Sequence, residues 1–372
     1  MKRKLWFVLD VRFPTEKAYG VTTTYTALAV KEMKDYDVEI ITPKLDKSLD
    51  NLIATREITM PFSHLYQALL SKGGKVAKVG FHAWKFLYAI KLSKSLNRNE
   101  SILWLRDIPL AFFLNMSGFK TICEIHRTPP KMLRLQLVSL NRKNSSVLIC
   151  ITEHLKEKLK LSGRNVIVAG MSVNENELKR EVRKKSQTTF TVGYLGTSHS
   201  SGNILSLNSV IRAATESKSQ GLDIRFKLIG ISSDEAKHIF KQSIPDNLEF
   251  LGRVNRKAAF NLLDTFDVGL VLYPNSKYFI DSFPIKIVEY AARRVPILAS
   301  DTHAHRMILG KDKALFFNLD SERSLLDSIL ELKSSLILRD SLSKNAFTWV
   351  ESHTYQRRAH LVLTFSQTRF VE

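Results

Sequence analysis

The sequence has few cysteines and no long apolar run. Only two cysteines occur among its 372 residues, Cys123 and Cys150, and both lie in apolar, strand-like segments, where a thiol behaves as a small hydrophobic side chain. Neither a disulfide framework nor a zinc site is therefore expected. No apolar stretch is long enough to span a bilayer, and Asp10 and Arg12 break the N-terminal run too early for a signal peptide. We expect a cytoplasmic protein.

Negative charge is scarce relative to positive charge. The chain has 56 Lys and Arg residues against 36 Asp and Glu, a formal net charge of +20. Residues 1–200 alone hold 33 basic and 17 acidic residues. This asymmetry favours an anionic partner, either a phospholipid surface or nucleic acid, with a solvated basic face as the alternative. No RRM, KH or helix-turn-helix pattern is present, so no nucleic-acid partner is expected.

Several catalytic signatures are also missing. The sequence contains no HExxH, no Cys/His cluster, no GxSxG, no P-loop and no repeat of fixed period. Asp35 and Asp37 form a D-x-D pattern, but they lie where a turn between a helix and a strand is expected, so we predict no metal site there.

Apolar strand patterns alternate with helical ones along most of the chain, which predicts an α/β protein. Its length exceeds what one core usually supports, and the charged segment KREVRKKSQTTF separates two halves. We predict an N-terminal domain at 1–180 and a C-terminal domain at 189–350. The strands are expected at 5–11, 38–42, 102–105, 121–125, 147–151 and 166–169, then in the segment TFTVGYLG, and at 224–229, 248–251, 268–272 and 295–299.

The stretch from Phe283 to Asp301, FPIKIVEYAARRVPILASD, predicts a helix followed by a buried strand. Pro284 suits a first helical turn, and the hydroxyl of Ser282 could cap it. The helix start and the ammonium of Lys286 together favour an anion. Glu289, one turn later, can accept hydrogen bonds from sugar hydroxyls.

Asp281 and Glu289, with seven residues between them in DSFPIKIVEY, resemble the Glu-x7-Glu signature of retaining family 4 glycosyltransferases in its P-x-K-x-x-E-Y variant. The resemblance implies a GT-B fold, in which two Rossmann-like domains face each other across a cleft and a terminal segment, here 351–372, crosses back to the first domain. It places Glu289 on the ribose of a nucleotide diphosphate sugar. Asp281, one methylene shorter than the usual glutamate, would contact the transferred sugar.

Other segments extend this resemblance. KTICEIH is similar to the E-x-H strand end of the family, whose histidine, here His126, contacts the transferred sugar. Gly20 and Arg106 match positions on the acceptor side. Thr197 and Ser201 stand where the family usually has Arg and Lys, so Lys286, Arg253 or a further residue of the first domain would neutralise the leaving diphosphate. The resemblance thus predicts catalytic roles for His126, Asp281 and Lys286, and donor contacts for Gly196, Thr197, Ser201, Gly230, Arg253, Pro284 and Glu289.

The activity implied is transfer of a sugar, with retention of configuration, from a UDP- or GDP-linked donor to a hydroxyl of a lipid-linked saccharide or polysaccharide in cell-envelope glycan synthesis. Neither a metal nor a cofactor is implied. Two alternatives are a GT-B nucleotide-sugar epimerase and a degenerate GT-B binding module.

Residues 71–98 predict a helix with two apolar stripes. We assign the stripe of Val79, Ala83, Phe86, Leu87 and Ile90 to the core. The aromatic stripe of Phe81, Trp84, Tyr88 and Leu92 lies beside Lys75, Lys78 and Lys85. It could enter a headgroup layer, or the helix could lie between two packed layers. With the basic cluster Arg127, Lys131, Arg134, Arg142 and Lys143, it suggests docking of the first domain on an anionic membrane.

Overall fold

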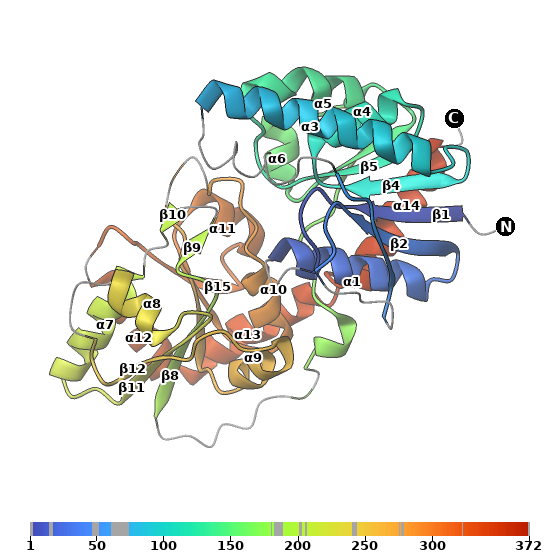
Figure 1. The fold of residues 1–372 in the computed structure, drawn as a ribbon. Coiled ribbons are helices and arrows are strands. Elements are labelled where there is room, and N and C mark those ends of the chain that lie inside the picture. Colours follow the sequence, from blue (N-terminus) through green and yellow to red (C-terminus); the bar gives the residue numbers. More distant parts are fainter. Residues whose placement is uncertain are drawn as a thin grey trace. The chain divides into compact units, whose positions relative to one another are not determined.

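The computed structural model describes residues 3–14, 18–46, 52–60, 74–179, 181, 189–200, 203–204, 207–239, 244–274, 276, 279–321 and 323–370. The chain divides into two compact units, Met1–Gly170 with Tyr355–Glu372 (unit 1) and Met171–Thr354 (unit 2) (Figure 1). Each unit has its own parallel sheet, which confirms the predicted α/β class.

Unit 1 is built on a seven-stranded parallel sheet with strand order β3-β2-β1-β4-β5-β6-β7. Its strands are β1 (Arg3–Val8), β2 (Tyr36–Thr42), β3 (Ala54–Glu57), β4 (Ser101–Leu105), β5 (Lys120–Ile125), β6 (Ser146–Cys150) and β7 (Val166–Val168). The order reverses between β1 and β4, as in doubly wound dinucleotide-binding folds. All residues of β4 and β6 are buried, as expected of central parallel strands covered on both faces.

Helices cover both faces of this sheet (Figure 1). They are α1 (Ala18–Glu32), α3 (Gly74–Ser95), α4 (Ile108–Met116), α5 (Arg134–Asn141), α6 (Glu153–Lys158) and α14 (Tyr355–Phe370). α1 and α14 pack side by side, with the rings of Tyr25 and Tyr355 stacked at 5.5 Å, and they bury a common core with Phe7, Trp104 and Ile149. α3, α4 and α5 lie on the other face (Figure 1).

Unit 2 is built on a six-stranded parallel sheet with order β12-β11-β8-β13-β14-β15, beside a two-stranded antiparallel pair. The strands are β8 (Phe190–Leu195), β9 (His199–Ser200), β10 (Asn203–Ile204), β11 (Ile224–Ile229), β12 (Leu248–Phe250), β13 (Val268–Val271), β14 (Ile297–Ser300) and β15 (Ala314–Phe317). The helices are α7 (Asn208–Ser219), α8 (Ser233–Ile239), α9 (Arg256–Leu263), α10 (Ile285–Ala292), α11 (His303–Leu309), α12 (Ser324–Ser334) and α13 (Leu336–Val350).

α10 is locked against the sheet of unit 2 by Tyr290. A Cβ atom at Gly269 in β13 would lie 2.8 Å from the Tyr290 ring, so the ring rests on bare backbone. The Tyr290 hydroxyl accepts a hydrogen bond from the Leu195 N–H (2.8 Å) and donates to the Leu270 carbonyl (3.3 Å). One side chain therefore fixes the height and register of α10 over β8 and β13.

The boundaries of the two units differ from the predicted ones. Residues 171–179, which we assigned to the first domain, lie in unit 2, because Val173 pairs with Thr354 and the Lys179 N–H donates to the Ala292 carbonyl (2.8 Å). Unit 2 ends at Thr354, after which α14 returns to unit 1. Most of the predicted linker lies outside the described residues.

The assignment of the first stripe of α3 to the core was wrong. Trp84, Tyr88 and Leu92 are buried, whereas Phe86 and Leu87 are about half exposed and Ala83 is exposed. Both stripes are apolar, so periodicity alone could not choose between them; the choice follows from Lys85, which is fully buried between Asp10 and Asp107. The side chains of Val79, Phe81, Lys75 and Lys78 lie outside the described part.

The two edge strands β3 and β15 were not predicted. β3 has no buried residue and reads ATRE, which carries no apolar alternation. Tyr36 and Asp37 of the D-x-D pattern lie in β2 rather than in a turn. Among the helices that the structure describes, none has the length and apolar character needed to cross a bilayer.

Candidate functional site

The first cluster of polar side chains lies where the strand order of unit 1 reverses. Parallel strands gather their ligands at their carboxyl ends near such a point. Asp10 follows β1, Arg106 and Asp107 follow β4, and His126 follows β5. The structure therefore places the predicted residues Arg106 and His126 along one edge of one sheet.

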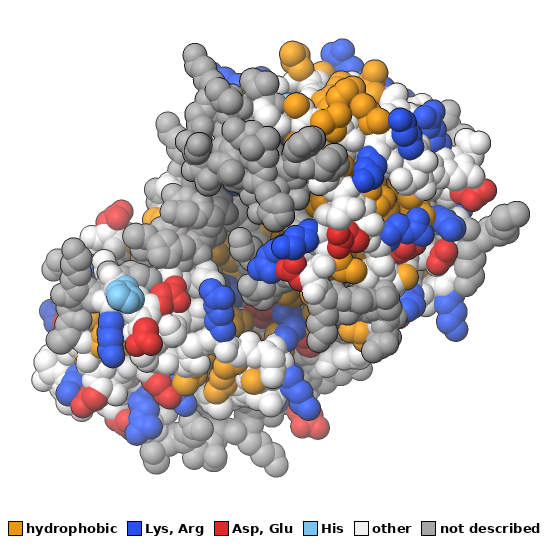
Figure 2. Space-filling view, viewed as in Figure 1, with side chains coloured by type: hydrophobic (Ala, Val, Ile, Leu, Met, Phe, Trp, Pro, Cys, Tyr) orange, Lys and Arg blue, Asp and Glu red, His pale blue; other side chains and the backbone are white. Residues whose placement is uncertain are grey.

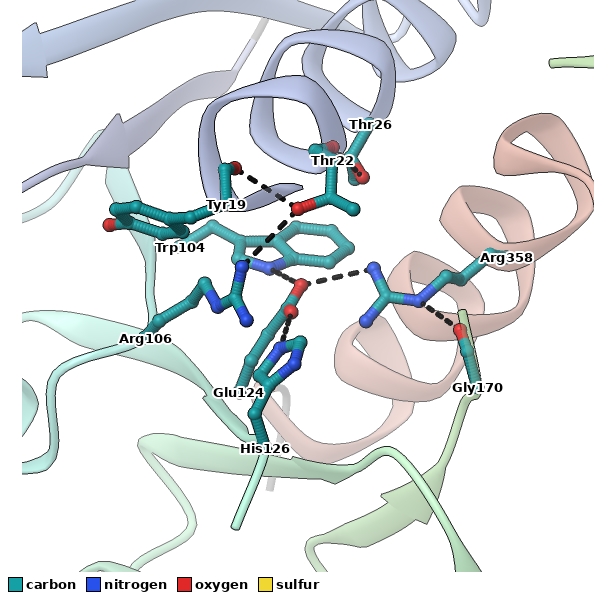
Figure 3. Close-up of polar contacts among 9 residues, drawn as sticks. All are labelled: Tyr19, Thr22, Thr26, Trp104, Arg106, Glu124, His126, Gly170 and Arg358. Atoms are coloured by element: carbon teal, nitrogen blue, oxygen red, sulfur yellow. Dashed lines mark hydrogen bonds and ion pairs between the residues drawn. The ribbon is translucent and has the colours of Figure 1, made fainter. Parts of the chain in front are cut away.

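Glu124 is the centre of this cluster (Figure 3). Its Oε1 accepts hydrogen bonds from the Trp104 indole (2.7 Å) and from Arg358 of α14 (3.0 Å), and its Oε2 lies 2.7 Å from His126 Nε2. Arg358 is held in turn by the Gly170 carbonyl (3.0 Å). The C-terminal helix thus completes the surroundings of a strand end more than two hundred residues earlier in the chain.

The surroundings of His126 in this cluster determine its protonation state. Burial, reinforced by the nearby Arg106 guanidinium, lowers the pKa of His126 to about 4, so the imidazole is neutral at pH 7. Although burial opposes it, the guanidinium of Arg358 and the hydrogen bond from His126 hold the pKa of Glu124 well below its usual range. Because an ionised carboxylate can only accept, the proton of His126 belongs on Nε2. Nδ1 is then an acceptor for a hydroxyl group.

Arg106 lies beside Glu124 and packs on α1. Its Nη1 donates to Thr22 Oγ1 (3.2 Å), and its guanidinium lies 4.6 Å from the centre of the Tyr19 ring. These residues border a cavity of about 10 Å³, room for about one water molecule. Gly20, the other predicted acceptor-side residue, is buried in the first turn of α1, one residue after Tyr19.

Lys85 joins a second set of charges at the same edge. Its ammonium pairs with Asp10 and lies 3.3 Å from Asp107 Oδ2. Asp107 also caps α4 through the Leu110 N–H (2.8 Å), and burial raises the pKa of its carboxyl. Asp107 therefore pairs with Lys85, whereas its neighbour Arg106 contacts α1.

The second cluster surrounds the start of α10 in unit 2. Pro284 is the N-cap residue, one position before its predicted place in the first turn, and no side chain of the described residues caps the helix. The predicted cap by Ser282 is therefore absent: the Ser282 N–H donates to the Phe279 carbonyl (2.9 Å). Asp281, in the turn before the helix, is almost fully buried.

Three glycines end neighbouring strands beside this helix. Gly196, Gly230 and Gly252 have φ angles of 147°, 100° and 64°, which side chains disfavour. The Gly230 N–H donates to the Gly252 carbonyl (2.7 Å), and a Cβ at Gly230 would lie 2.6 Å from the Gly196 carbonyl oxygen. A Cβ at Gly196 would lie 2.8 Å from Lys286 Nζ. The loop after β8 and the ammonium of Lys286 are therefore in close proximity.

Lys286 is a buried cation with aromatic neighbours. Its Nζ lies 3.8 Å from the centre of the Tyr194 ring and 5.6 Å from that of Tyr273. Within the described ranges no carboxylate lies at ion-pair distance from it, and burial lowers its pKa to about 7, although Glu289 opposes this. A buried amine of this kind gains its proton when an anion arrives.

Glu289 lies one turn further along α10 and is held by an arginine that sequence reasoning missed. Its Oε1 accepts a hydrogen bond from Arg256 Nη1 (2.8 Å). Arg256 also donates from Nε and Nη2 to the two oxygens of Glu177, at 2.6 and 2.9 Å. No motif marked Arg256, because its role appears only when α9 and α10 lie together.

The remaining predicted donor residues have different surroundings. Thr197 is exposed, and its carbonyl accepts a hydrogen bond from the Tyr194 hydroxyl (2.9 Å). Arg253 is exposed in the loop between β12 and α9. Ser201 lies outside the described residues. Among the described side chains, no group of three or more His, Cys, Asp or Glu is arranged to hold a metal ion.

The sequence match to a known family lies within one of the two units. Residues 205–349, within unit 2, match the family model described as "Glycosyl transferases group 1". No curated protein matches the chain in sequence.

Solved structures match over nearly the whole chain. A glycosyltransferase from Rickettsia africae has a TM-score of 0.71 at 14% identity, with 99% of this chain and 98% of that chain covered. Anabaena HepE, solved in complex with UDP and glucose, has a TM-score of 0.65 at 14% identity, with 98% of each chain covered. WaaG, a glycosyltransferase involved in lipopolysaccharide biosynthesis, has a TM-score of 0.66 at 11% identity, with 97% and 99% covered.

At such identities the likeness establishes the fold and leaves the substrate open. The chain therefore has the GT-B fold of these glycosyltransferases, and residues 205–349 of its second unit match the glycosyl transferases group 1 family.

Proposed function

We propose that this protein is a retaining glycosyltransferase that moves a sugar from a UDP- or GDP-linked donor to a hydroxyl group of an acceptor. The observation that carries the proposal is the convergence of three features in unit 2: the glycine loop at Gly196, the buried amine of Lys286 and the carboxylate of Glu289 on the same helix. They suit, respectively, a diphosphate, its negative charge and a ribose.

In the proposed reaction, the bond between the anomeric carbon and the leaving phosphate oxygen breaks while the acceptor oxygen attacks from the same face. The acceptor proton passes to the leaving phosphate, and the proposed reaction uses no metal. Lys286 and backbone N–H groups stabilise the charge that develops on that phosphate. Asp281 and the neutral His126 would contact the transferred sugar, and Gly20 and Arg106 the acceptor.

The acceptor is proposed to be a lipid-linked saccharide or polysaccharide of the cell envelope, reached from the cytoplasmic face of a membrane. WaaG, a structural neighbour, is involved in lipopolysaccharide biosynthesis. Support within this chain comes from an exposed apolar patch on α3, α4 and the segment 131–141, where Figure 2 shows hydrophobic side chains gathered. The patch residues are Phe86, Leu87, Met116, Met132, Leu135 and Val138.

Basic residues border this apolar patch. Lys143 Nζ lies 3.1 Å from the sulfur of Met116, and Arg134 and Lys131 are exposed beside Leu135 and Met132. An apolar surface rimmed by lysine and arginine suits an anionic lipid leaflet. The docking surface is therefore the face of α3 that carries Phe86 and Leu87, in place of the aromatic stripe that is buried.

A panel of UDP- and GDP-linked sugars followed by thermal shift tests the proposal, because a bound donor stabilises only the native state. One class of donor should raise the melting temperature, and incubation with that donor and a hydroxyl acceptor should release nucleoside diphosphate. Product formed without any acceptor would favour the epimerase, and binding without turnover would favour a degenerate module. The absence of any shift across the panel would contradict nucleotide-sugar binding.

A further inference from the structure

Glu289 is held by only one of its two oxygens. Arg256 Nη1 donates to Oε1 at 2.8 Å. Oε2 accepts no hydrogen bond from the described residues, although the residue is 95% buried. A carboxylate that is fixed through one oxygen presents the other in a defined direction. This geometry suits a group that must meet the hydroxyls of a ligand.

Arg256 is itself fixed and cannot follow Glu289 freely. Its Nε and Nη2 donate to both oxygens of Glu177, a side-on pairing that sets the plane of the guanidinium. The guanidinium also lies 4.7 Å from the centre of the Phe260 ring, one turn further along α9. Asn255 caps that helix through the Ala258 N–H (2.9 Å), so the backbone that carries Arg256 is anchored as well.

Glu177, the partner of Arg256, is itself held in place by hydrogen bonds. It closes a capping box with Asn174, accepting from the Asn174 N–H at 3.2 Å. The Glu177 carbonyl accepts a hydrogen bond from Arg293 (3.2 Å), which also pairs with Asp264. Hydrogen bonds therefore connect the fixed segment at Glu177 through Arg256 to Glu289 on α10.

We infer that Arg256 is a positioning residue for nucleotide binding: it holds the Glu289 carboxylate, with Glu177 as its anchor, so that Oε2 is presented to the ribose hydroxyls. The inference rests on the proposed function, because it assigns the ribose to Glu289. Arg256 acts through Glu289 and not on the diphosphate. Its removal should therefore affect ligands that contain a ribose and spare those that do not.

The experiment compares UDP or GDP with inorganic pyrophosphate by calorimetric titration of the full chain. Arg256→Gln should weaken nucleoside diphosphate binding about 10-fold, the scale of a hydrogen bond to a charged group, and should leave pyrophosphate binding unchanged. Arg256→Lys keeps the charge but loses the side-on pairing. Its affinity for the nucleoside diphosphate should lie between those of the parent and of Arg256→Gln. Glu177→Gln should weaken binding less, and should add nothing in the Arg256→Gln background.

Arg323→Gln is the matched control, because Arg323 also donates from Nε and Nη2 to a glutamate, Glu216, but touches none of the site residues. It should bind both ligands as the parent does. Unchanged or tighter nucleotide binding in folded Arg256→Gln would overturn the inference, as would an equal loss for pyrophosphate. Failure of the proposed function gives a different result, since Glu289→Gln itself would then leave nucleotide binding unchanged.

Discussion

Burial lowers the pKa of both His126 and Lys286, but with different consequences. His126 shares a hydrogen bond with an ionised glutamate and is neutral over the physiological range. Lys286 has a pKa of about 7 and therefore changes charge within that range. Only the second group should give the reaction a pH dependence near neutrality.

The charge of Lys286 leads to a prediction for donor binding. A diphosphate beside the amine favours the ammonium and raises its pKa above 7, so binding at pH 8 should take up as much as one proton, and affinity should fall as the pH rises. Calorimetry in buffers of different ionisation enthalpy measures this uptake. Lys286→Arg, whose guanidinium does not titrate, should bind without uptake. A wild-type binding enthalpy that does not depend on the buffer would contradict the role of Lys286.

A second prediction at this scale concerns His126. His126→Ala should lower kcat far more than it weakens donor binding, because contacts made mainly in the transition state appear in kcat. His126 should add no titration of its own to the parent's activity between pH 8 and about pH 5, since the histidine is already neutral there; the pH dependence near neutrality belongs to Lys286. Steady-state kinetics with a matched donor titration provides both values. Parent-like turnover in a folded His126→Ala protein would leave His126 with a structural role only.

At the scale of elements, α10 and the strand β14 were the segments most completely predicted from sequence. Their apolar periods are unbroken, and the elements lie within two residues of their predicted positions. α3 was harder, because Lys85 interrupts a buried face. Its burial depends on Asp10 and Asp107, which belong to other strand ends. No local pattern could reveal that partnership.

The same limit applies to the candidate sites. His126, Lys286 and Glu289 could be proposed from sequence because each lies in a short, recognisable segment. Arg256 and Arg358 were missed because each acts across long sequence separations, on Glu289 and on Glu124. Basic residues are common on helix surfaces, so a single arginine in the sequence does not indicate a functional role.

The packing of the Tyr290 ring of α10 against Gly269 of β13 leads to a prediction about stability. Gly269→Ala would bring a methyl group to 2.8 Å from the Tyr290 ring, and overpacking of this kind costs about 1 to 3 kcal/mol of unfolding free energy. Combining it with Tyr290→Ala should cost less than the sum of the two single changes, since they share one contact. Denaturant titration of the three variants measures this. Strict additivity would show that Tyr290 does not set the position of α10.

For the whole molecule, the charge excess of residues 1–200 and the apolar patch of α3, α4 and segment 131–141 predict docking of unit 1 on anionic membranes. Co-sedimentation with vesicles should rise with anionic lipid content and fall with salt, because surface charges are screened within about 8 to 10 Å at physiological ionic strength. Leu135→Ser, at a side chain that is 82% exposed, should weaken it.

Ile337→Ser provides the control, because Ile337 is equally exposed (84%) but belongs to unit 2. It should sediment as the parent does. Equal losses for Leu135→Ser and Ile337→Ser, or tighter binding to RNA than to anionic vesicles at the same salt concentration, would count against the docking surface. Lys85 cannot serve in such a test, since its reversal would break a buried ion pair.

We propose that unit 2 binds a nucleotide diphosphate sugar through Glu289. The most direct test of this proposal is a calorimetric titration of the wild-type protein and Glu289→Gln with the donor that stabilises the protein most. The variant, still folded, should bind both donor and free nucleotide more weakly by about 1 to 3 kcal/mol, the scale of charge-assisted hydrogen bonds. Equal affinities of the two proteins for the nucleotide would contradict it.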